Sequence, residues 1–182
     1  MKMVKRNYVV LFILALVFSL PGLAAYEFYK HPQWLGASSV NKGKLLNPPE
    51  LLANLNAKPK WRLVLWNPGK CEQSCREQID KLARIRLALG RRLYEVDELL
   101  VIDKQTYALS REFIKNLKEH DINAFGISDA EHKKQTLLTE KPQVFIANPD
   151  DYLVLAYELD AKPADIFHDL QQLLRTTKSK SS

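Results

Sequence analysis

The sequence predicts an α/β domain with a mixed sheet and flanking helices, preceded by one N-terminal transmembrane helix. Three observations support this prediction. The chain opens with an uncharged, mostly apolar run from Asn7 to Tyr26. From Trp61 onward, short apolar runs typical of strands alternate with longer runs typical of helices. Near the end, two apolar runs flank an Asn-Pro-Asp-Asp turn, which predicts a hairpin.

The first 26 residues have the character of a membrane anchor. Residues 1–6 carry Lys2, Lys5 and Arg6, and the apolar run of residues 7–26 follows. About twenty apolar residues span a bilayer as a helix, and positive charges before the run keep the N-terminus in the cytoplasm. In a bacterium we therefore expect a single-pass protein of the inner membrane whose domain is periplasmic. A cleavable signal peptide is the alternative, because Gly22 and Ala24 resemble a cleavage site, but the run is longer than a usual signal core.

The remaining elements follow in order along the chain. Residues 27–60 contain several prolines and glycines and predict a tether followed by an extended segment. "WRLVLW" predicts a strand, "EQSCREQIDKLARIRLALG" a helix, "YEVDELLVID" a strand and "YALSREFIKNLKEH" a helix. "NAFGIS" fits a short strand or a loop. The hairpin "QVFIANPDDYLVLAYEL" and the helix "PADIFHDLQQLLR" follow, and residues 176–182 predict a flexible tail.

This order of elements resembles the thioredoxin-like plan over residues 61–175. A strand, a crossover helix and a second strand make parallel neighbours, and the later hairpin adds an antiparallel pair.

The net charge of +6 is misleading, because it comes from the two ends of the chain. Six of the 27 basic residues lie at the ends, and the 21 that remain balance the 21 acidic ones. A neutral body argues against nucleic-acid binding, which needs a concentrated basic face. One local basic run follows the cysteines: Lys81, Arg84, Arg86, Arg91 and Arg92. A solvated helix face is the simpler interpretation, and a docking patch for an acidic partner or anionic lipid is the alternative.

The two cysteines of the chain, Cys71 and Cys75, lie in "WNPGKCEQSC", between a predicted strand and a predicted helix. The carboxyl end of a strand is where α/β sheets usually place their sites, and a helix N-terminus favours a thiolate. Their spacing puts both sulfurs on one face of the helix, where they can form a disulfide or hold a soft ion, Cu(I) before zinc. A static disulfide or two inert thiols is the alternative, although so short a loop gains little stability from a bridge.

Further metal ligands are few. Of the four histidines, His132 is the best placed to approach the cysteines, because it lies in the polar loop before the last hairpin. Both methionines, Met1 and Met3, lie at the cytoplasmic end, so the exported part has no methionine-rich copper site.

The anchor and the "WNPGKCEQSC" motif resemble the Sco/SenC group of cytochrome c oxidase assembly proteins, which are membrane-anchored thioredoxin-like domains with a CxxxC copper site. The likeness is closest to small Sco-like transmembrane proteins. It extends through "NKGKLLNPP", "WRLVLWNPGKCEQSCREQIDKLARIRLALGRR" and "VFIANPDDYLVLAYELDAKPADIFHDLQQLLR". The resemblance implies that Cys71 and Cys75 are the metal or redox pair. In thioredoxin-like folds a cis proline at the start of the strand that matches "QVFIAN" faces the cysteines, and Pro142 is a candidate for it; a trans proline at a strand start is the default alternative.

The sequence departs from the Sco pattern at one position. Sco proteins carry a third copper ligand, a histidine just before the strand that matches "VFIAN", and Glu140 or a neighbour stands there in this chain. Tight Cu(II) binding is therefore not expected, whereas Cu(I) between two sulfurs or thiol–disulfide exchange fits the residues that remain.

Three functions are compatible with these observations. The first is a membrane-anchored Sco-like factor that assists assembly of the copper centre of a cytochrome oxidase subunit, alone or with other assembly factors, by Cu(I) handling or thiol–disulfide exchange. The second is a general periplasmic thiol–disulfide oxidoreductase. The third is a non-catalytic scaffold that has lost copper and uses Arg84, Arg91 and Arg92 as a contact surface. The first accounts for the anchor, the motif and the resemblance together, and we expect it.

Overall fold

The computed structural model describes residues 2–31, 41–52, 58–103, 109–133 and 135–180, and the chain divides into two compact units. The first unit, Met1–Val40, contains helix α1 (Lys2–Lys30). Residues Val10–Lys30 are long and apolar enough to cross a membrane, and none of this segment is buried against protein. A helix that is apolar on all sides needs a lipid or protein environment. The predicted N-terminal transmembrane helix is therefore present as a candidate span.

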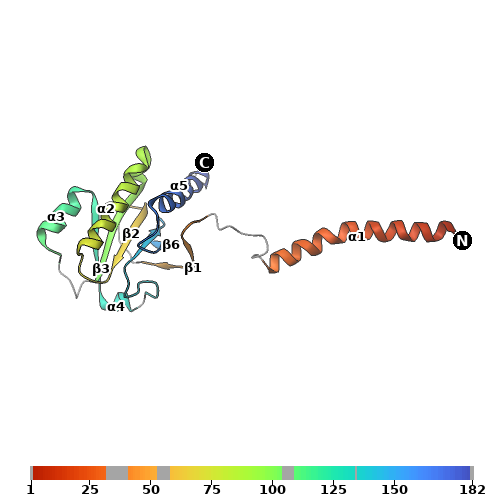
Figure 1. The fold of residues 1–182 in the computed structure, drawn as a ribbon, viewed down its shortest axis with the longest axis horizontal. Helices are drawn as coiled ribbons and strands as arrows, with labels where there is room; N and C mark the ends of the chain where they lie inside the picture. The colour runs from red at the N-terminus through yellow and green to blue at the C-terminus, as the bar shows by residue number, and fades with distance from the viewer. Residues whose placement is uncertain (1, 32–40, 53–57, 104–108, 134, 181–182) are drawn as a thin grey trace. The chain divides into compact units, whose positions relative to one another are not determined.

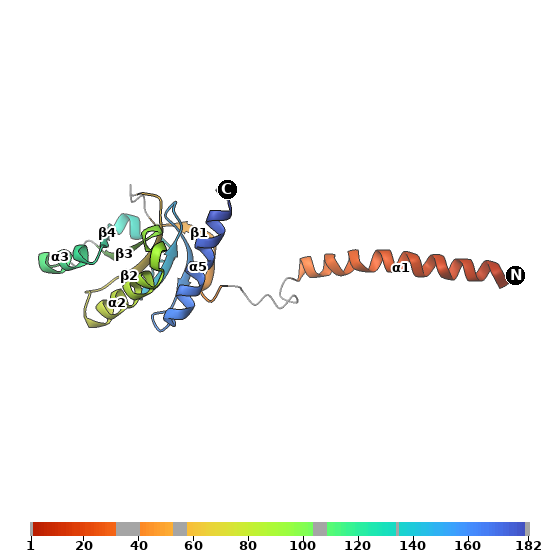
Figure 2. The same ribbon diagram turned by 90° about the horizontal axis from the view of Figure 1, so that it is seen from above.

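The second unit, Asn41–Ser182, is built on a six-stranded mixed sheet with strand order β1-β6-β5-β2-β3-β4 (Figures 1 and 2). The strands are β1 (Lys44–Leu51), β2 (Trp61–Asn67), β3 (Val96–Asp103), β4 (Ile122–Ile127), β5 (Gln143–Ala147) and β6 (Tyr152–Tyr157). Strands β2, β3 and β4 are parallel, whereas β5, β6 and β1 are each antiparallel to their neighbours. The predicted mixed sheet and hairpin are confirmed.

The helices cover mainly one face of this sheet. Helices α2 (Gln73–Ala88), α3 (Arg111–Glu119) and α5 (Pro163–Lys180) pack over the first core, which includes Leu65, Cys75 and Leu100. The second core lies on the other face, around Trp66 and Phe145. Short helix α4 (Asp129–His132) contributes His132, whose ring lies 5.1 Å from the ring of Trp66. Successive residues of a strand point to opposite faces, so Leu65 and Trp66 belong to different cores.

The segment predicted as an extended part of the tether is strand β1, at one edge of the sheet. A buried carboxylate on α5 fixes the start of this segment, because Asp169 accepts hydrogen bonds from the amides of Lys42 (2.8 Å) and Gly43 (2.8 Å) and from the Tyr157 hydroxyl (2.8 Å). Burial favours a raised pKa for Asp169, but these hydrogen bonds outweigh it and lower the pKa. The compact unit therefore begins at Asn41, upstream of the start at residue 61 that the sequence predicts.

Other element boundaries differ from the prediction for local reasons. Helix α3 begins at Arg111 because the Ser110 side chain accepts a hydrogen bond from the amide of Phe113 (3.1 Å) and caps the helix. Residues 104–108, which include the predicted helix start, lie outside the described residues. A 3-10 helix, η2 (Gly90–Glu95), delays the start of β3 to Val96. Helix α5 continues past Arg175 to Lys180, so the backbone of residues 176–180 is helical where the sequence predicts a tail.

Candidate redox site

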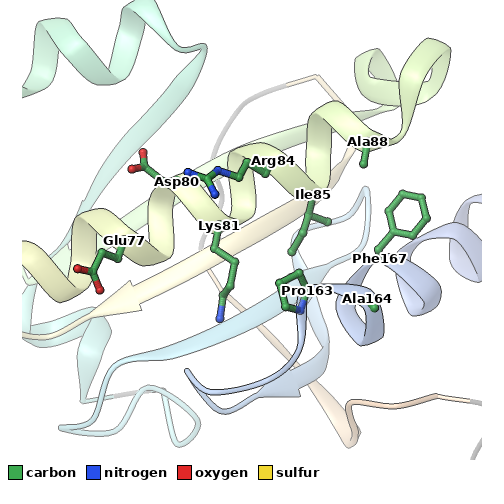
Figure 3. Close-up of a pocket in the computed structure, with 9 residues that line it drawn as sticks. All are labelled: Glu77, Asp80, Lys81, Arg84, Ile85, Ala88, Pro163, Ala164 and Phe167. Carbon is green, nitrogen blue, oxygen red and sulfur yellow. The ribbon is translucent and has the colours of Figure 1, made fainter.

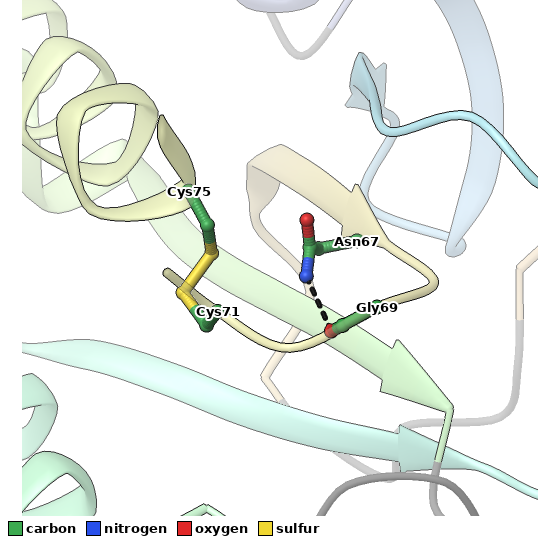
Figure 4. The surroundings of a disulfide bond; sticks show 4 residues. All are labelled: Asn67, Gly69, Cys71 and Cys75. Atoms are coloured by element: carbon green, nitrogen blue, oxygen red, sulfur yellow. Dashed lines mark hydrogen bonds between the residues drawn. A yellow bond between two sulfur atoms is a disulfide. The ribbon is translucent and has the colours of Figure 1, made fainter. Parts of the chain in front are cut away.

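A strand, a turn and a helix place the two cysteines. Strand β2 ends at Asn67, whose buried side chain donates a hydrogen bond to the Gly69 carbonyl (2.6 Å) and closes the Pro68–Gly69 turn (Figure 4). The chain then enters α2 at Gln73, with Glu72 at the N-cap position. The Glu72 side chain makes no capping hydrogen bond. Cys71 therefore stands just before the helix, and Cys75 stands in its first turn.

Cys71 and Cys75 form a disulfide, with their Cα atoms 5.0 Å apart. The two sulfurs differ in exposure. Cys75 is 6 % exposed and belongs to the first core, whereas Cys71 is only partly buried and packs on the edge of that core. An incoming thiol therefore reaches the sulfur of Cys71 more easily than that of Cys75. Attack at Cys71 makes Cys75 the leaving sulfur; the unpartnered amide N–H groups of the first helical turn favour its thiolate, whereas burial in the core opposes that charge.

Charged side chains surround the pair without forming a single-sign field. Lys70 precedes Cys71 and Glu72 follows it, and both side chains are exposed. The Arg76 guanidinium lies over the ring of Phe113 on α3, 5.3 Å from its centroid, which holds this positive charge on the α3 side of α2. The charges of these side chains therefore do not add up to one sign at the cysteine pair.

A small pocket of about 180 Å³ lies beside Cys75. Its lining includes Cys75, Gln78, Pro142 and Leu159. Pro142 thus lines the same pocket as Cys75, on the side of the sheet where thioredoxin-like folds place their proline. Among the described residues the cis peptide bond is Asn47–Pro48, so the peptide bond before Pro142 is trans. Pro142 is therefore the trans proline that is the default at a strand start, not the cis proline of thioredoxin-like folds.

The structure does not bring the other predicted ligands to the cysteines. His132 contacts Trp66 on the opposite face of the sheet, and its Nε2 lies 2.8 Å from the Leu138 carbonyl oxygen. Glu140 is exposed, in the loop before β5. Across the described residues, no group of three or more His, Cys, Asp or Glu side chains is arranged to hold a metal ion. Cys71 and Cys75 therefore lack the third ligand of a three-ligand copper site among the described residues, and in the disulfide form they offer no thiolate.

Sequence reasoning overlooked Asn67 and misassigned Arg86. The Asn-Pro-Gly sequence is itself a clue to Asn67, because asparagine side chains often bond to the backbone two residues on. The basic run was expected to lie on a solvated face, but Arg86 is buried, and its Nε donates to the Val96 carbonyl (2.7 Å) while its other end pairs with Asp121. This arginine joins α2 to the turn before β4 and contributes no free charge.

These features define a class: a thioredoxin-like domain with a cysteine pair at a helix N-terminus, behind a candidate membrane span. Residues 61–177 match the model of the transmembrane-like, thioredoxin-like C-terminal domain family. The chain belongs to this family.

The solved structures similar to this chain support the same fold. Apo Sco1 from Thermus thermophilus has a TM-score of 0.53 at 15% identity and covers 73% of this chain and 96% of its own. Copper-bound ScoI from Arabidopsis thaliana has a TM-score of 0.52 at 13% identity and covers 66% and 88%. BsSco, described as a Sco-family cytochrome c oxidase assembly protein with a disulfide switch, has a TM-score of 0.50 at 13% identity, with 72% and 94% covered. No curated protein sequence matches the chain.

Proposed function

We propose that this protein is a membrane-anchored, Sco-like factor that assists assembly of the copper centre of a cytochrome c oxidase by thiol–disulfide exchange at Cys71 and Cys75. The observation that carries the proposal is the asymmetric disulfide at the start of α2, with one accessible and one buried sulfur. The role in oxidase assembly is supported by the resemblance to Sco proteins. The basic residues before α1 favour a cytoplasmic N-terminus and a periplasmic domain in a bacterial inner membrane.

The exchange needs only the two cysteines and a substrate disulfide. In the reduced protein, the Cys71 thiolate attacks one sulfur of the substrate disulfide, forms a mixed disulfide and releases the first substrate thiolate. The Cys75 thiolate then attacks the Cys71 sulfur, closes the Cys71–Cys75 bond and releases the second substrate thiolate. Two electrons pass to the substrate, and its two cysteines become free to bind copper. The disulfide form of the structure is the product of this sequence.

Trapping of the mixed disulfide tests the order of these steps. In Cys75→Ser the resolving sulfur is absent, so we expect a mixed disulfide between Cys71 and the oxidase copper subunit to accumulate in cells. In Cys71→Ser the remaining thiol is buried, so accumulation should be much weaker. Both variants should lower oxidase activity, and Ser74→Ala, a change of similar size between the cysteines, serves as the control. Normal oxidase assembly in both cysteine variants would refute the proposal.

Transfer of Cu(I) is the second candidate function. The reduced pair would hold two thiolates close together, and the copper-bound Arabidopsis protein shares this fold. An anaerobic Cu(I) titration of the reduced protein against a competing chelator separates the two functions. Stoichiometric binding that disappears in the Cys71→Ala, Cys75→Ala double variant would favour copper transfer. Binding no stronger than in that variant would leave thiol–disulfide exchange as the function.

A further inference from the structure

An unpartnered hydrogen-bond acceptor lies on the same helix face as the buried cysteine. Gln78 follows Cys75 by three residues on α2, a spacing that makes their side chains neighbours on the helix surface. Both residues line the pocket of about 180 Å³. The Gln78 Oε1 atom is buried, and it has no hydrogen-bond partner among the described residues. Buried carbonyl oxygens without a partner are rare in native proteins, so this one calls for a physical explanation.

The walls of this pocket are poor sources of a donor for that oxygen. Leu65 and Leu159 have apolar side chains, and Pro142 has neither a polar side chain nor an amide hydrogen. The side-chain amide of Asn67 donates to the Gly69 carbonyl instead (Figure 4). The disulfide form therefore leaves the acceptor unsatisfied.

The charged side chains near the pocket do not act on Cys75 with one sign. Lys70 and Glu72 line the pocket, and both are exposed. Lys81 is directed elsewhere, because its Nζ donates to the Leu159 carbonyl (2.6 Å), and Figure 3 shows this side chain extending from α2 toward the turn before α5. That hydrogen bond also holds the Leu159 wall of the pocket. The influence of the pocket on Cys75 therefore comes mainly from burial and hydrogen bonding.

Reduction of the disulfide creates a donor at this place. A dithiol reductant gives two electrons and two protons to the Cys71–Cys75 bond and becomes a disulfide itself, so each cysteine sulfur gains one hydrogen. The new S–H group of Cys75 is a donor, whereas the same sulfur in the disulfide carries no hydrogen. Because Cys75 is 6 % exposed, water competes poorly for this donor.

We propose that Gln78 is a positioning residue whose side-chain oxygen accepts a hydrogen bond from the Cys75 thiol in the reduced protein. The inference rests on the thiol–disulfide exchange proposed for the cysteine pair. A hydrogen bond to the neutral thiol favours the protonated form of Cys75 and stabilises the dithiol relative to the disulfide. Cys71 is then the thiolate that attacks the substrate. Once the mixed disulfide has formed, the Cys75 proton passes to the released substrate thiolate, and the Cys75 sulfur attacks Cys71.

The reduction potential tests the energetic part of the proposal. The full chain in zwitterionic nanodiscs is equilibrated with mixtures of reduced and oxidised dithiothreitol, and thiol labelling measures the fraction of disulfide. Gln78→Leu removes the acceptor, so the equilibrium constant for reduction should fall about tenfold, which lowers the potential by about 30 mV. Gln78→Glu keeps an oxygen acceptor and should not lower the potential. Gln73→Leu, the same change on α2 outside the pocket, is the matched control and should leave the potential unchanged.

The infrared S–H stretching band tests the hydrogen bond itself. In Cys71→Ser the chain holds a single cysteine, so the band belongs to Cys75. A hydrogen-bonded S–H group absorbs at a lower frequency than a free one. Adding Gln78→Leu to this variant should therefore move the band to higher frequency, and adding Gln73→Leu should leave it in place.

Three results would overturn the inference. The first is an unchanged potential and band position in Gln78→Leu, and the second is an equal shift in Gln73→Leu. The third is a higher potential in Gln78→Leu, which would mean that the amide N–H group faces the sulfur in place of the oxygen. These measurements need no oxidase, so their failure is distinct from failure of the proposed function, which the oxidase activity of Cys71→Ser and Cys75→Ser decides.

Discussion

Replacing Glu98 by glutamine should make the domain more stable at neutral pH. Glu98 lies on β3, paired with Leu63 of β2 and Ile122 of β4, and is 2 % exposed. Neither of its carboxyl oxygens has a hydrogen-bond partner among the described residues. Burial raises the pKa of Glu98 from 4.5 to about 8, although the positive charge of Arg86 opposes the change and Asp80 reinforces it. At neutral pH the folded protein therefore holds this carboxyl in its protonated form.

The size of the effect follows from proton linkage. The unfolded chain releases this proton near pH 4.5, whereas the folded chain keeps it up to about pH 8. The contribution of Glu98 protonation to the free energy of unfolding is therefore fully present below pH 4.5. It decreases as the pH rises toward 8, by about 1.4 kcal/mol per pH unit. The total loss is about 5 kcal/mol, of which about 3 kcal/mol has occurred at pH 7. Glutamine keeps a similar shape and has no proton to lose, so its variant should lack this decrease.

Urea unfolding of residues 41–182, one of the two compact units, measures the effect between pH 4.5 and 8.5. Glu98→Gln should be close to the unmodified protein at pH 4.5 and more stable by about 3 kcal/mol at pH 7. Asp97→Asn is the matched control, because Asp97 is the neighbouring residue and pairs with Lys60 (2.7 Å), so its loss should give no gain. Parallel pH profiles for the unmodified protein and Glu98→Gln would refute the reasoning.

Two predictions concern the hydrogen bonds of Asp169 and the packing of Gly43 at the start of β1, and one concerns the loop before β5. Gly43→Ala should destabilise the domain by about 1–3 kcal/mol in urea unfolding, because the added methyl would lie 2.5 Å from the ring of Tyr157; an unchanged midpoint would contradict this. Asp169→Asn should cost about 3 kcal/mol at pH 7. Because the folded pKa of Asp169 is lowered, this difference should persist above about pH 4 and shrink as the pH falls further, which a pH series of unfolding curves would check. His132→Ala should increase amide hydrogen exchange at Thr139 and Leu138, since His132 contacts both Trp66 and the Leu138 carbonyl; unchanged protection would exclude this anchoring role.

The central elements could be predicted from local pattern. The strand of residues 61–67, the helix after it and the final hairpin can each be predicted from hydrophobic periodicity, segment length or turn residues. The Pro-Gly turn between strand and helix fixed the place of Cys71 and Cys75, because the end of a strand and the start of a helix are defined by the same few residues. The candidate span was readable for the same reason, since a long apolar run is a property of sequence alone.

Long-range contacts decided the rest. Strand β1 contains two prolines and alternates poorly; it pairs with β6, and the residues just before it are held by Asp169, more than 120 residues away in the chain. Arg86 resembles a surface residue by composition, yet its partners are the Val96 carbonyl and Asp121. His132 lies before the hairpin in the sequence, as a ligand for the cysteines would. Helix α4, which follows β4, places it instead on the other face of the sheet, against Trp66. Sequence determines what each segment prefers, whereas the face of the sheet on which a side chain lies depends on the path of the whole chain.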